Sequence, residues 1–247
     1  MSPRLDAELA ARGLARSRTH AAALIESGAV TVDGRTARKP STPVGPEATL
    51  IVTDADRYVS RAAHKLVAAL DAFAIDVAGR VALDMGASTG GFTQVLRERG
   101  ADPVLAVDVG HGQLASEVAA DPGVVVVEGF NVRYMTRESL AEASGIGAAP
   151  GVVTGDLSFI SLTRVLPAVA EVAAADADVV LLVKPQFEVG RGAIGDGVVT
   201  DPALRAGAVD AVLAAAEELG LGVRGVIPSP LPGTHGNVEF LAHLTRP

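Results

Sequence analysis

The sequence predicts an α/β protein in which a mostly parallel sheet follows a small, basic α+β domain. From residue 81 onward, apolar runs of strand length alternate with helical segments, which is typical of a parallel sheet covered by helices on both faces. Aromatic side chains make up 3% of the 247 residues and tryptophan is absent, so the core must consist mainly of Ala, Val and Leu. The net charge is -8, yet residues 1–45 hold seven basic and only four acidic side chains. A basic module therefore precedes an acidic body.

The basic module begins with two predicted short helices. Apolar side chains at helical spacing define them: Leu5, Leu9 and Leu14 in the first, and Ala21, Leu24 and Ile25 in the second. Ser17 stands at the N-cap position of the second helix, and Gly28 stands at its end. Residues 29–38, with Asp33-Gly34 at their centre, predict a β-hairpin with a tight primed turn. The apolar run at residues 50–52 is expected to complete the sheet of this module.

Basic side chains gather at the start of the second helix. Arg16 and Arg18 flank the helix N-terminus, whose dipole also attracts phosphate, so the arrangement suits an RNA backbone. A solvated basic face is the alternative. The segments RLD, GLARSR, AAALIESGAV and TVDG resemble the alpha-L RNA-binding motif across most of the module. This resemblance implies that Arg4, Arg16, Arg18 and Lys39 face structured RNA.

A domain boundary is expected after the proline- and glycine-containing segment that begins at residue 40. We place the RNA-binding domain at residues 1–56, a linker at about 53–59 and a second domain at 60–247. The second domain opens with a predicted helix at about 60–73, whose apolar side carries Leu66, Ala69, Leu70 and Phe73. Lys65 lies within one turn of that apolar side, a position at which a lysine is ordinarily solvated.

A glycine-rich turn joins the first predicted strand of the second domain to a helix. In VALDMGASTGGFTQ, residues 81–83 read as a buried strand, 86–91 as the turn and 92–99 as the helix. Glycines at such a junction let the backbone approach a ligand closely, and the helix N-terminus offers free N–H groups. The turn predicts a small-molecule pocket, with a purely structural turn as the alternative.

The ligand predicted for this turn is a nucleoside that carries no pyrophosphate. The spacing of Gly86, Gly90 and Gly91 does not match the G-x-G-x-x-G fingerprint of dinucleotide sites. Asp108 closes the next apolar run, residues 104–107, at the strand end where a ribose diol would be held. This combination favours an adenosyl ligand.

The remaining elements predict one sheet with an antiparallel edge. Successive parallel strands are expected at residues 81–85, 104–109, 124–128, 152–156 and 179–184. A long helix at 202–219 precedes two further strands, 222–227 and 238–244, which are expected to form an antiparallel pair. Ligands bind at the C-terminal ends of strands in such sheets, so four charged side chains should point toward one crevice: Asp84, Asp108, Asp156 and Lys184.

Charged residues at the ends of apolar strands are the candidate catalytic residues. Asp156 and Lys184 each occupy such a position, where a structural ion pair is the alternative to a functional role. Glu239, within GNVEF, adds a carboxylate on the last strand, and Lys65 can approach from the helix before the first strand. We therefore expect two lysines and two acids to converge.

These four residues resemble the Lys-Asp-Lys-Glu tetrad of FtsJ-like ribose 2'-O-methyltransferases, in the same chain order. More narrowly, SRAAHKL, GASTGGFT, DLSFISL, VKPQFEVG and GNVEF resemble the TlyA (hemolysin A-like) family. The resemblance implies a Rossmann-like class I methyltransferase fold with a mostly parallel seven-stranded sheet. It also implies methyl transfer from S-adenosylmethionine to the ribose 2'-hydroxyl of cytidines in small- and large-subunit rRNA, either free or within ribosomal subunits.

The resemblance assigns an expected role to each site residue. A hydroxyl is a poor nucleophile, so it needs a base or a strong acceptor while the methyl group is held in line. Lys184 is the candidate that accepts or orients the proton, since a buried lysine near a second lysine can have a lowered pKa. Asp156 would position Lys184, and Lys65 and Glu239 would hold the ribose. The cofactor would be held by Asp84, Gly86, Ala87, Ser88, Thr89, Gly90, Gly91, Phe92, Asp108 and Val109, and further phosphate contacts are expected from Arg61 and Arg133.

Composition also disfavours several classes of protein. The absence of cysteine excludes disulfides and thiolate metal sites and is compatible with the cytoplasm, where we expect the protein. The five histidines show no metal-ligand spacing, so no metal is expected.

No signal peptide is visible and no run approaches about 20 apolar residues, which argues against a membrane-acting, hemolysin-like protein. A catalytically silent rRNA-binding assembly factor is the other alternative. Residues 190–197 are expected to form either a lid or a mobile loop.

Overall fold

The computed structural model describes residues 3–15, 17–52, 58–190 and 197–246. The chain divides into two compact units, Met1–Arg61 and Ala62–Pro247. The expected linker at about 53–59 lies largely outside the described residues, as do Arg16 and most of the expected lid or loop at 190–197.

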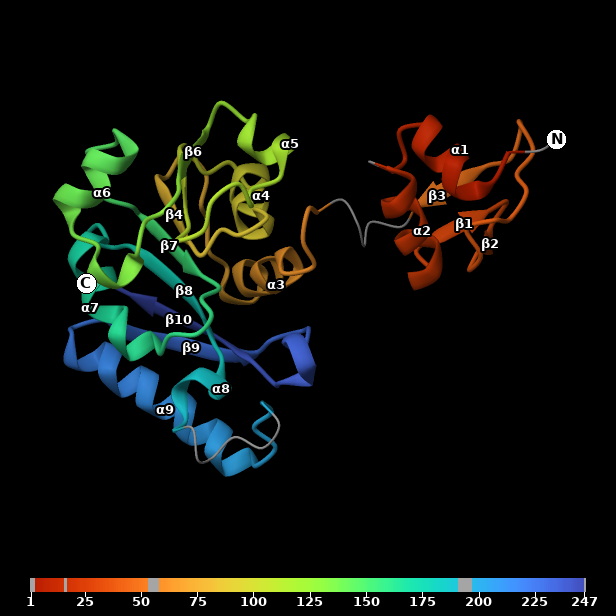
Figure 1. Ribbon diagram of the computed structural model, residues 1–247. Coiled ribbons are helices and arrows are strands. Elements are labelled where there is room, and N and C mark those ends of the chain that lie inside the picture. The colour runs from red at the N-terminus through yellow and green to blue at the C-terminus, as the bar shows by residue number, and fades with distance from the viewer. Residues whose placement is uncertain (1–2, 16, 53–57, 191–196, 247) are drawn as a thin grey trace. The chain divides into compact units, whose positions relative to one another are not determined.

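Unit 1 packs two helices against a small antiparallel sheet (Figure 1). Its elements are α1 (Leu5–Ala11), α2 (Arg18–Ser27), β1 (Val30–Val32), β2 (Arg35–Thr36) and β3 (Leu50–Val52). The strand order is β2-β1-β3, so the predicted third strand completes the sheet along β1. A core of fully buried side chains, including Leu5, Leu9 and Leu24, joins the helices to the sheet. These side chains hold the basic residues of the unit on a fixed scaffold.

The local signals of unit 1 are confirmed with one exception. Ser17 caps α2 by accepting a hydrogen bond from the backbone N–H of His20, and Gly28 ends the helix in the left-handed conformation. Asp33 and Gly34 both have positive φ, as a primed hairpin turn requires. The placement of Leu14 in the first helix is wrong, because α1 ends at Ala11 and Leu14 is exposed.

Unit 2 is built on a seven-stranded sheet of order β6-β5-β4-β7-β8-β10-β9. The strands are β4 (Ala82–Met85), β5 (Val104–Val107), β6 (Val124–Val127), β7 (Val152–Gly155), β8 (Asp178–Val183), β9 (Gly222–Pro228) and β10 (Phe240–Thr245). Strands β4 to β8 pair in parallel, as predicted. The final antiparallel pair is also confirmed, with β10 inserted between β8 and the edge strand β9.

Helices cover both faces of this sheet (Figure 1). They are α3 (Ala63–Phe73), α4 (Gly91–Glu98), α5 (Ser116–Ala119), α6 (Arg137–Ser144), α7 (Leu166–Val172), α8 (Pro185–Glu188) and α9 (Pro202–Glu218), with short 3-10 turns η2 (Val132–Tyr134), η3 (Leu162–Arg164) and η5 (Thr234–Gly236). Helices α3 and α4 pack together on one face, while α6, α7 and α9 lie on the other. A buried core of Val, Leu and Ala fills the space between the sheet and the second group, as the aromatic-poor composition requires.

The topology brings distant segments to the C-terminal ends of the parallel strands. The segments that follow β4, β5, β7 and β8 all leave the sheet at that edge. The residue before Phe240 joins them there, because β10 runs antiparallel and Phe240 pairs with Val183 at the end of β8. This edge is where the candidate site residues are found.

Candidate active site

The glycine-rich turn after β4 takes a conformation that requires glycine at two positions. Gly86 has φ +78°, and a Cβ built there would lie 3.2 Å from the carbonyl oxygen of Asp156. Gly90 has φ +97°, and a Cβ there would lie 2.8 Å from the side chain of Leu114. Larger residues would be strained at both positions and would also push neighbouring segments apart. The turn therefore lies closely against the loop that carries Asp156.

A cleft of about 540 Å³ opens beside this turn, which is a volume that suits a small-molecule ligand. Its lining is contributed by Val107 at the end of β5 and by the segments that follow β4, β5, β6 and β7. Of the expected cofactor residues, those that line the cleft are Gly86, Ser88, Asp108 and Val109. The remaining wall comes from Val107, Gln113, Phe130, Asn131, Val132, Asp156, Leu157, Ser158, Phe159 and Ile160.

Asp108 is fixed by backbone hydrogen bonds on both of its carboxylate oxygens. Oδ2 accepts from the N–H of Ser88 at 2.8 Å, and Oδ1 accepts from the N–H of Gly110 at 2.8 Å. The first bond ties the end of β5 to the glycine-rich turn. Each oxygen retains a second lone pair, so the carboxylate can still accept bonds from a ligand diol.

The expectation that Asp84 points into the crevice is wrong. Its side chain is fully buried and accepts hydrogen bonds from the hydroxyls of Thr93 at 2.6 Å and Thr154 at 3.2 Å. Burial raises the pKa of Asp84 to about 7, and the nearby charge of Asp156 adds to the increase. Asp84 thus joins β4, α4 and β7 beneath the cleft.

The other expected cofactor residues also support the turn from outside the cleft lining. Gly91 and Phe92 lie buried in the first turn of α4, and Ala87 and Gly90 are buried within the glycine-rich turn. Thr89 is exposed and accepts a hydrogen bond from the N–H of Ala115 through its carbonyl oxygen.

Lys184 and Asp156 form an ion pair at the edge of the sheet. The distance between Lys184 Nζ and Asp156 Oδ1 is 2.6 Å, and Lys184 also donates a hydrogen bond to the hydroxyl of Ser158 at 2.9 Å. Lys184 is buried, whereas Asp156 and Ser158 line the cleft. The amino group is therefore held directly behind two cleft residues.

Lys65 and Glu239 form a second and more deeply buried pair. Lys65 Nζ donates to Glu239 Oε2 at 2.6 Å, and the side chains are 7% and 2% exposed. A Cβ at Gly233 would lie 2.1 Å from Glu239 Oε1, so the glycine leaves the space that this carboxylate occupies. The pair joins α3 to the start of β10.

The strand register brings the two pairs together. Glu239 precedes Phe240, whose partner Val183 in β8 precedes Lys184. The two residues thus extend from adjacent strands at the same level. The four residues of the expected tetrad thus form two ion pairs, Lys65 with Glu239 and Lys184 with Asp156. Each buried positive charge is balanced by a negative one.

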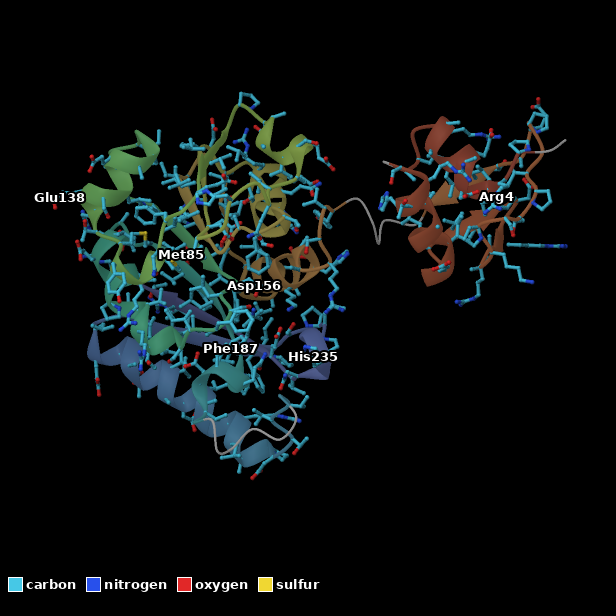
Figure 2. The ribbon with its side chains drawn as sticks, in the orientation of Figure 1. Arg4, Met85, Glu138, Asp156, Phe187 and His235 are labelled. Carbon is cyan, nitrogen blue, oxygen red and sulfur yellow. The ribbon has the colours of Figure 1, made fainter. Side chains whose placement is uncertain are left out.

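The loop that follows β7 contains two residues, Ser158 and Phe159, for which the sequence analysis predicts no role. The Phe159 ring is 92% exposed, its backbone has φ +65°, and its centroid lies 5.3 Å from that of Phe187. Figure 2 shows Asp156 and Phe187 at this edge of the sheet. Ser158 and Phe159 lie inside the DLSFISL motif, so the signal that could have identified them was the motif itself and the rarity of aromatic residues.

The basic residues of unit 1 include a clamp around one buried acid. Arg4 and Arg18 bind the two carboxylate oxygens of Asp6, with distances of 3.0 Å from Arg4 Nε to Oδ1 and from Arg18 Nη2 to Oδ2. The hydrogen bond from Arg4, followed by that from Arg18, lowers the pKa of Asp6 to about 2. The side chains of both arginines stay more than half exposed. Lys39 is exposed as well.

Arg61 and Arg133, the two further residues expected to contact phosphate, are both exposed but lie in different parts of the chain. Arg61 lies at the end of unit 1, and Arg133 lies on η2 with its guanidinium carbon 5.2 Å from the centroid of the Tyr134 ring. Within the described ranges, no cluster of three His, Asp or Glu residues could hold a metal ion. None of the helices in those ranges has the length and apolar character needed to cross a bilayer.

Comparison with known proteins gives full-length matches. An FtsJ-like methyltransferase model matches residues 58–246, and an S4 domain model matches residues 3–50. The chain is 57% identical over 244 residues to the 16S/23S rRNA (cytidine-2'-O)-methyltransferase TlyA of Mycobacterium tuberculosis, covering 98% of this chain and 89% of that protein.

Two further matches carry a hemolysin name. Hemolysin A of Brachyspira hyodysenteriae is 35% identical over 241 residues, covering 97% of this chain and 98% of that protein. A solved structure from Streptococcus thermophilus, provisionally assigned as a hemolysin, is 38% identical with a TM-score of 0.76 and covers 99% of this chain and 88% of that chain.

Proposed function

The chain belongs to the TlyA family of FtsJ-like methyltransferases, and from this membership we propose that it methylates the ribose 2'-hydroxyl of cytidine in rRNA. The methyl donor is S-adenosylmethionine. The substrate is small-subunit rRNA, large-subunit rRNA or both, in free form or within ribosomal subunits. The name of the mycobacterial relative, which refers to 16S and 23S rRNA, supports this choice.

The observation that carries the proposal is the position of Lys184. Its amino group is bonded to Asp156 and Ser158, and both of these residues line the cleft beside the glycine-rich turn. The amino group proposed to take the hydroxyl proton thus lies next to a pocket whose size and acidic strand end suit an adenosyl ligand.

The reaction places a defined demand on this chain. S-adenosylmethionine supplies an electrophilic methyl group, and the 2'-hydroxyl must lose its proton as its oxygen attacks. Lys184 Nζ has three positions besides its bond to Cε, and two of them are taken by donation to Asp156 and Ser158. The ammonium group of the ion pair has no lone pair, so Lys184 first gives up one proton; the third position is then a lone pair that accepts the hydroxyl proton and later releases it to solvent. Lys65, on α3, and Glu239, directly before β10, orient the ribose.

Methyl transfer to defined RNA substrates tests this proposal. Labelled cofactor is incubated with the full chain and naked rRNA, separate subunits or whole ribosomes, and the modified nucleotide is then mapped. We expect label on a cytidine ribose. A hemolysin-like protein would instead release dye from liposomes, and a silent assembly factor would bind rRNA without transferring label. If no substrate accepts a methyl group, the proposal is wrong.

We expect Asp108→Ala to weaken cofactor binding about tenfold to a hundredfold, because a charge-assisted bond to the ligand and the anchor of the turn are both lost. Isothermal titration of the purified variant measures this change. Asp108→Asn keeps one acceptor oxygen and should bind with an intermediate Kd. An unchanged Kd for Asp108→Ala would exclude Asp108 from the cofactor site.

We expect Arg4→Ala and Arg18→Ala each to reduce the slope of log K against log salt by about 1, since each removes one phosphate contact. Filter binding of rRNA between low and moderate salt measures the slope. Arg224→Ala, which removes an exposed arginine of β9, is the control and should leave the slope unchanged. Equal slopes in all four proteins would show that the two arginines do not contact RNA phosphate.

We expect Phe159→Ala to lower kcat/KM for RNA about tenfold, because a base that leaves its stack needs a flat apolar surface beside the pocket. Phe159→Trp keeps such a surface and should retain activity. Steady-state kinetics with RNA, together with the cofactor Kd, separate this effect from loss of the cleft. Comparable kcat/KM values in the alanine and wild-type proteins would contradict the stacking role.

A further inference from the structure

Two segments at the edge of the sheet contact each other through side chains both where they begin and where they end. The first, a loop of residues 156–161, follows β7, and the second, Lys184 together with the short helix α8, follows the neighbouring strand β8. Where the segments begin, Lys184 contacts Asp156 and Ser158. Where they end, Glu188 accepts hydrogen bonds from the Ser161 hydroxyl at 2.6 Å and the Leu162 N–H at 2.9 Å.

The first loop depends on these side-chain contacts for its conformation. In the part of the chain that the structure describes, residues 157–160 make no backbone–backbone hydrogen bond. Phe159 within this stretch also has positive φ, which is a strained conformation for a non-glycine residue. This segment is held by the contacts at its ends, by Leu157 and Ile160, which pack against the hydrophobic core, and by the contact of the Phe159 ring with that of Phe187.

The contact made by Glu188 is more than a helix cap. The 3-10 turn η3 already has a cap in its own chain, because the Ser161 hydroxyl accepts a hydrogen bond from the N–H of Thr163. Glu188 instead reaches across from the end of α8 and binds both Ser161 and the next backbone N–H. Burial raises the pKa of Glu188, which agrees with a carboxylate held between two segments away from bulk water.

We propose that Glu188 is a positioning residue that locks the loop carrying Asp156, Ser158 and Phe159 onto the segment carrying Lys184. The inference rests on the proposed function and deepens it. Release of the far end of the first loop would let Asp156 and Ser158 shift relative to Lys184. The third position on Lys184 Nζ would then lose its fixed direction, and a misplacement of about 1 Å can cost about 10²-fold in rate.

The kinetic test compares Glu188→Ala with Glu188→Gln. For Glu188→Ala we expect kcat to fall about 10²-fold while the KM for RNA changes little, because the RNA contacts of unit 1 are intact. Glu188→Gln should recover most of the rate, since the amide oxygen can still accept from Leu162 and the amide nitrogen can donate to Ser161. Single-turnover rates with saturating cofactor measure the chemical step.

A matched control removes the same kind of bond elsewhere. Asp121 accepts a hydrogen bond from the Gly123 N–H at 2.8 Å and binds Arg97, on the β6 side of the sheet. Asp121→Ala should lower stability to a similar extent and leave kcat unchanged. If Glu188→Ala keeps the wild-type kcat, or if Asp121→Ala loses as much activity, the positioning role is overturned.

A second readout does not depend on methyl transfer. The chain has no tryptophan, so Phe159→Trp introduces a unique fluorophore into the first loop. We expect its fluorescence anisotropy to fall when Glu188→Ala is added, and to stay high when Asp121→Ala is added instead. Unchanged anisotropy in both double variants would overturn the lock even in an active enzyme. If the anisotropy falls but the protein methylates no RNA, the positioning role of Glu188 is supported and the proposed function is wrong.

Discussion

Replacing Lys184 with alanine is expected to lower the single-turnover rate of methyl transfer by about 10³-fold without changing the cofactor Kd. The reason is the geometry of Nζ, which donates to Asp156 at 2.6 Å and to Ser158 at 2.9 Å and keeps one position for the substrate. Alanine removes the amino group held in this arrangement, whereas the cleft proposed for the cofactor is lined by other residues. Rapid quenching with labelled cofactor and saturating RNA measures the rate.

Lys184→Arg is expected to lower the single-turnover rate of methyl transfer almost as much as Lys184→Ala. The guanidinium group stays protonated at any working pH and therefore cannot accept the hydroxyl proton, and its planar fork does not match the tetrahedral arrangement of the amine. Arg99→Ala, which removes a surface ion pair with Asp71, is the control and should react at the wild-type rate. Wild-type single-turnover rates in both Lys184 variants would remove this residue from the chemistry.

The order of the elements could be predicted because it follows from local patterns. The parallel strands of unit 2 are short runs of Val, Leu and Ala with clear ends, and the hairpin of unit 1 carries Asp33-Gly34 at its turn. Such patterns are properties of the chain itself and survive folding. The prediction that Leu14 belongs to the first helix is wrong because an apolar residue at helical spacing does not indicate where the helix ends.

The position of an acidic residue near a strand end in the sequence does not determine whether its side chain reaches the cleft. Asp84 and Asp156 both follow this pattern, yet Asp84 is fully buried beneath the turn while Asp156 lines the cleft. In the register of the sheet, Asp84 lies inside β4 and level with Thr154 of β7, whereas Asp156 lies two positions further along, beyond the end of β7. Only the packed structure distinguishes them.

Contacts between loops were the hardest features to predict. Glu188 reads as one more acidic residue near the end of VKPQFEVG, and Asp6 reads as an acid that weakens a basic module. In the structure, Glu188 joins two segments and Asp6 fixes two arginines. Arg4 is a local partner of Asp6, but the contacts of Arg18 with Asp6 and of Glu188 with Ser161 and Leu162 are set by tertiary folding and follow from no spacing rule of a single segment.

The buried pair of Lys65 and Glu239 leads to the second large expected effect. Removing one member, as in Glu239→Ala, leaves an uncompensated buried charge and should cost about 3–5 kcal/mol of unfolding free energy. The variant should also lose methyl transfer. Because an unstable protein is inactive for a trivial reason, the single variant cannot separate the structural role of this pair from its role toward the ribose.

The double variant Lys65→Met/Glu239→Met separates the two roles. It removes both charges and keeps apolar volume, so we expect unfolding free energy close to that of the wild type in denaturant titrations. Methyl transfer should remain lost, since neither methionine can hydrogen-bond a ribose hydroxyl. If the double variant recovered both stability and wild-type single-turnover rate, the pair would be a structural ion pair alone. The chemistry would then rest on Lys184 and Asp156 without help from the adjacent strand.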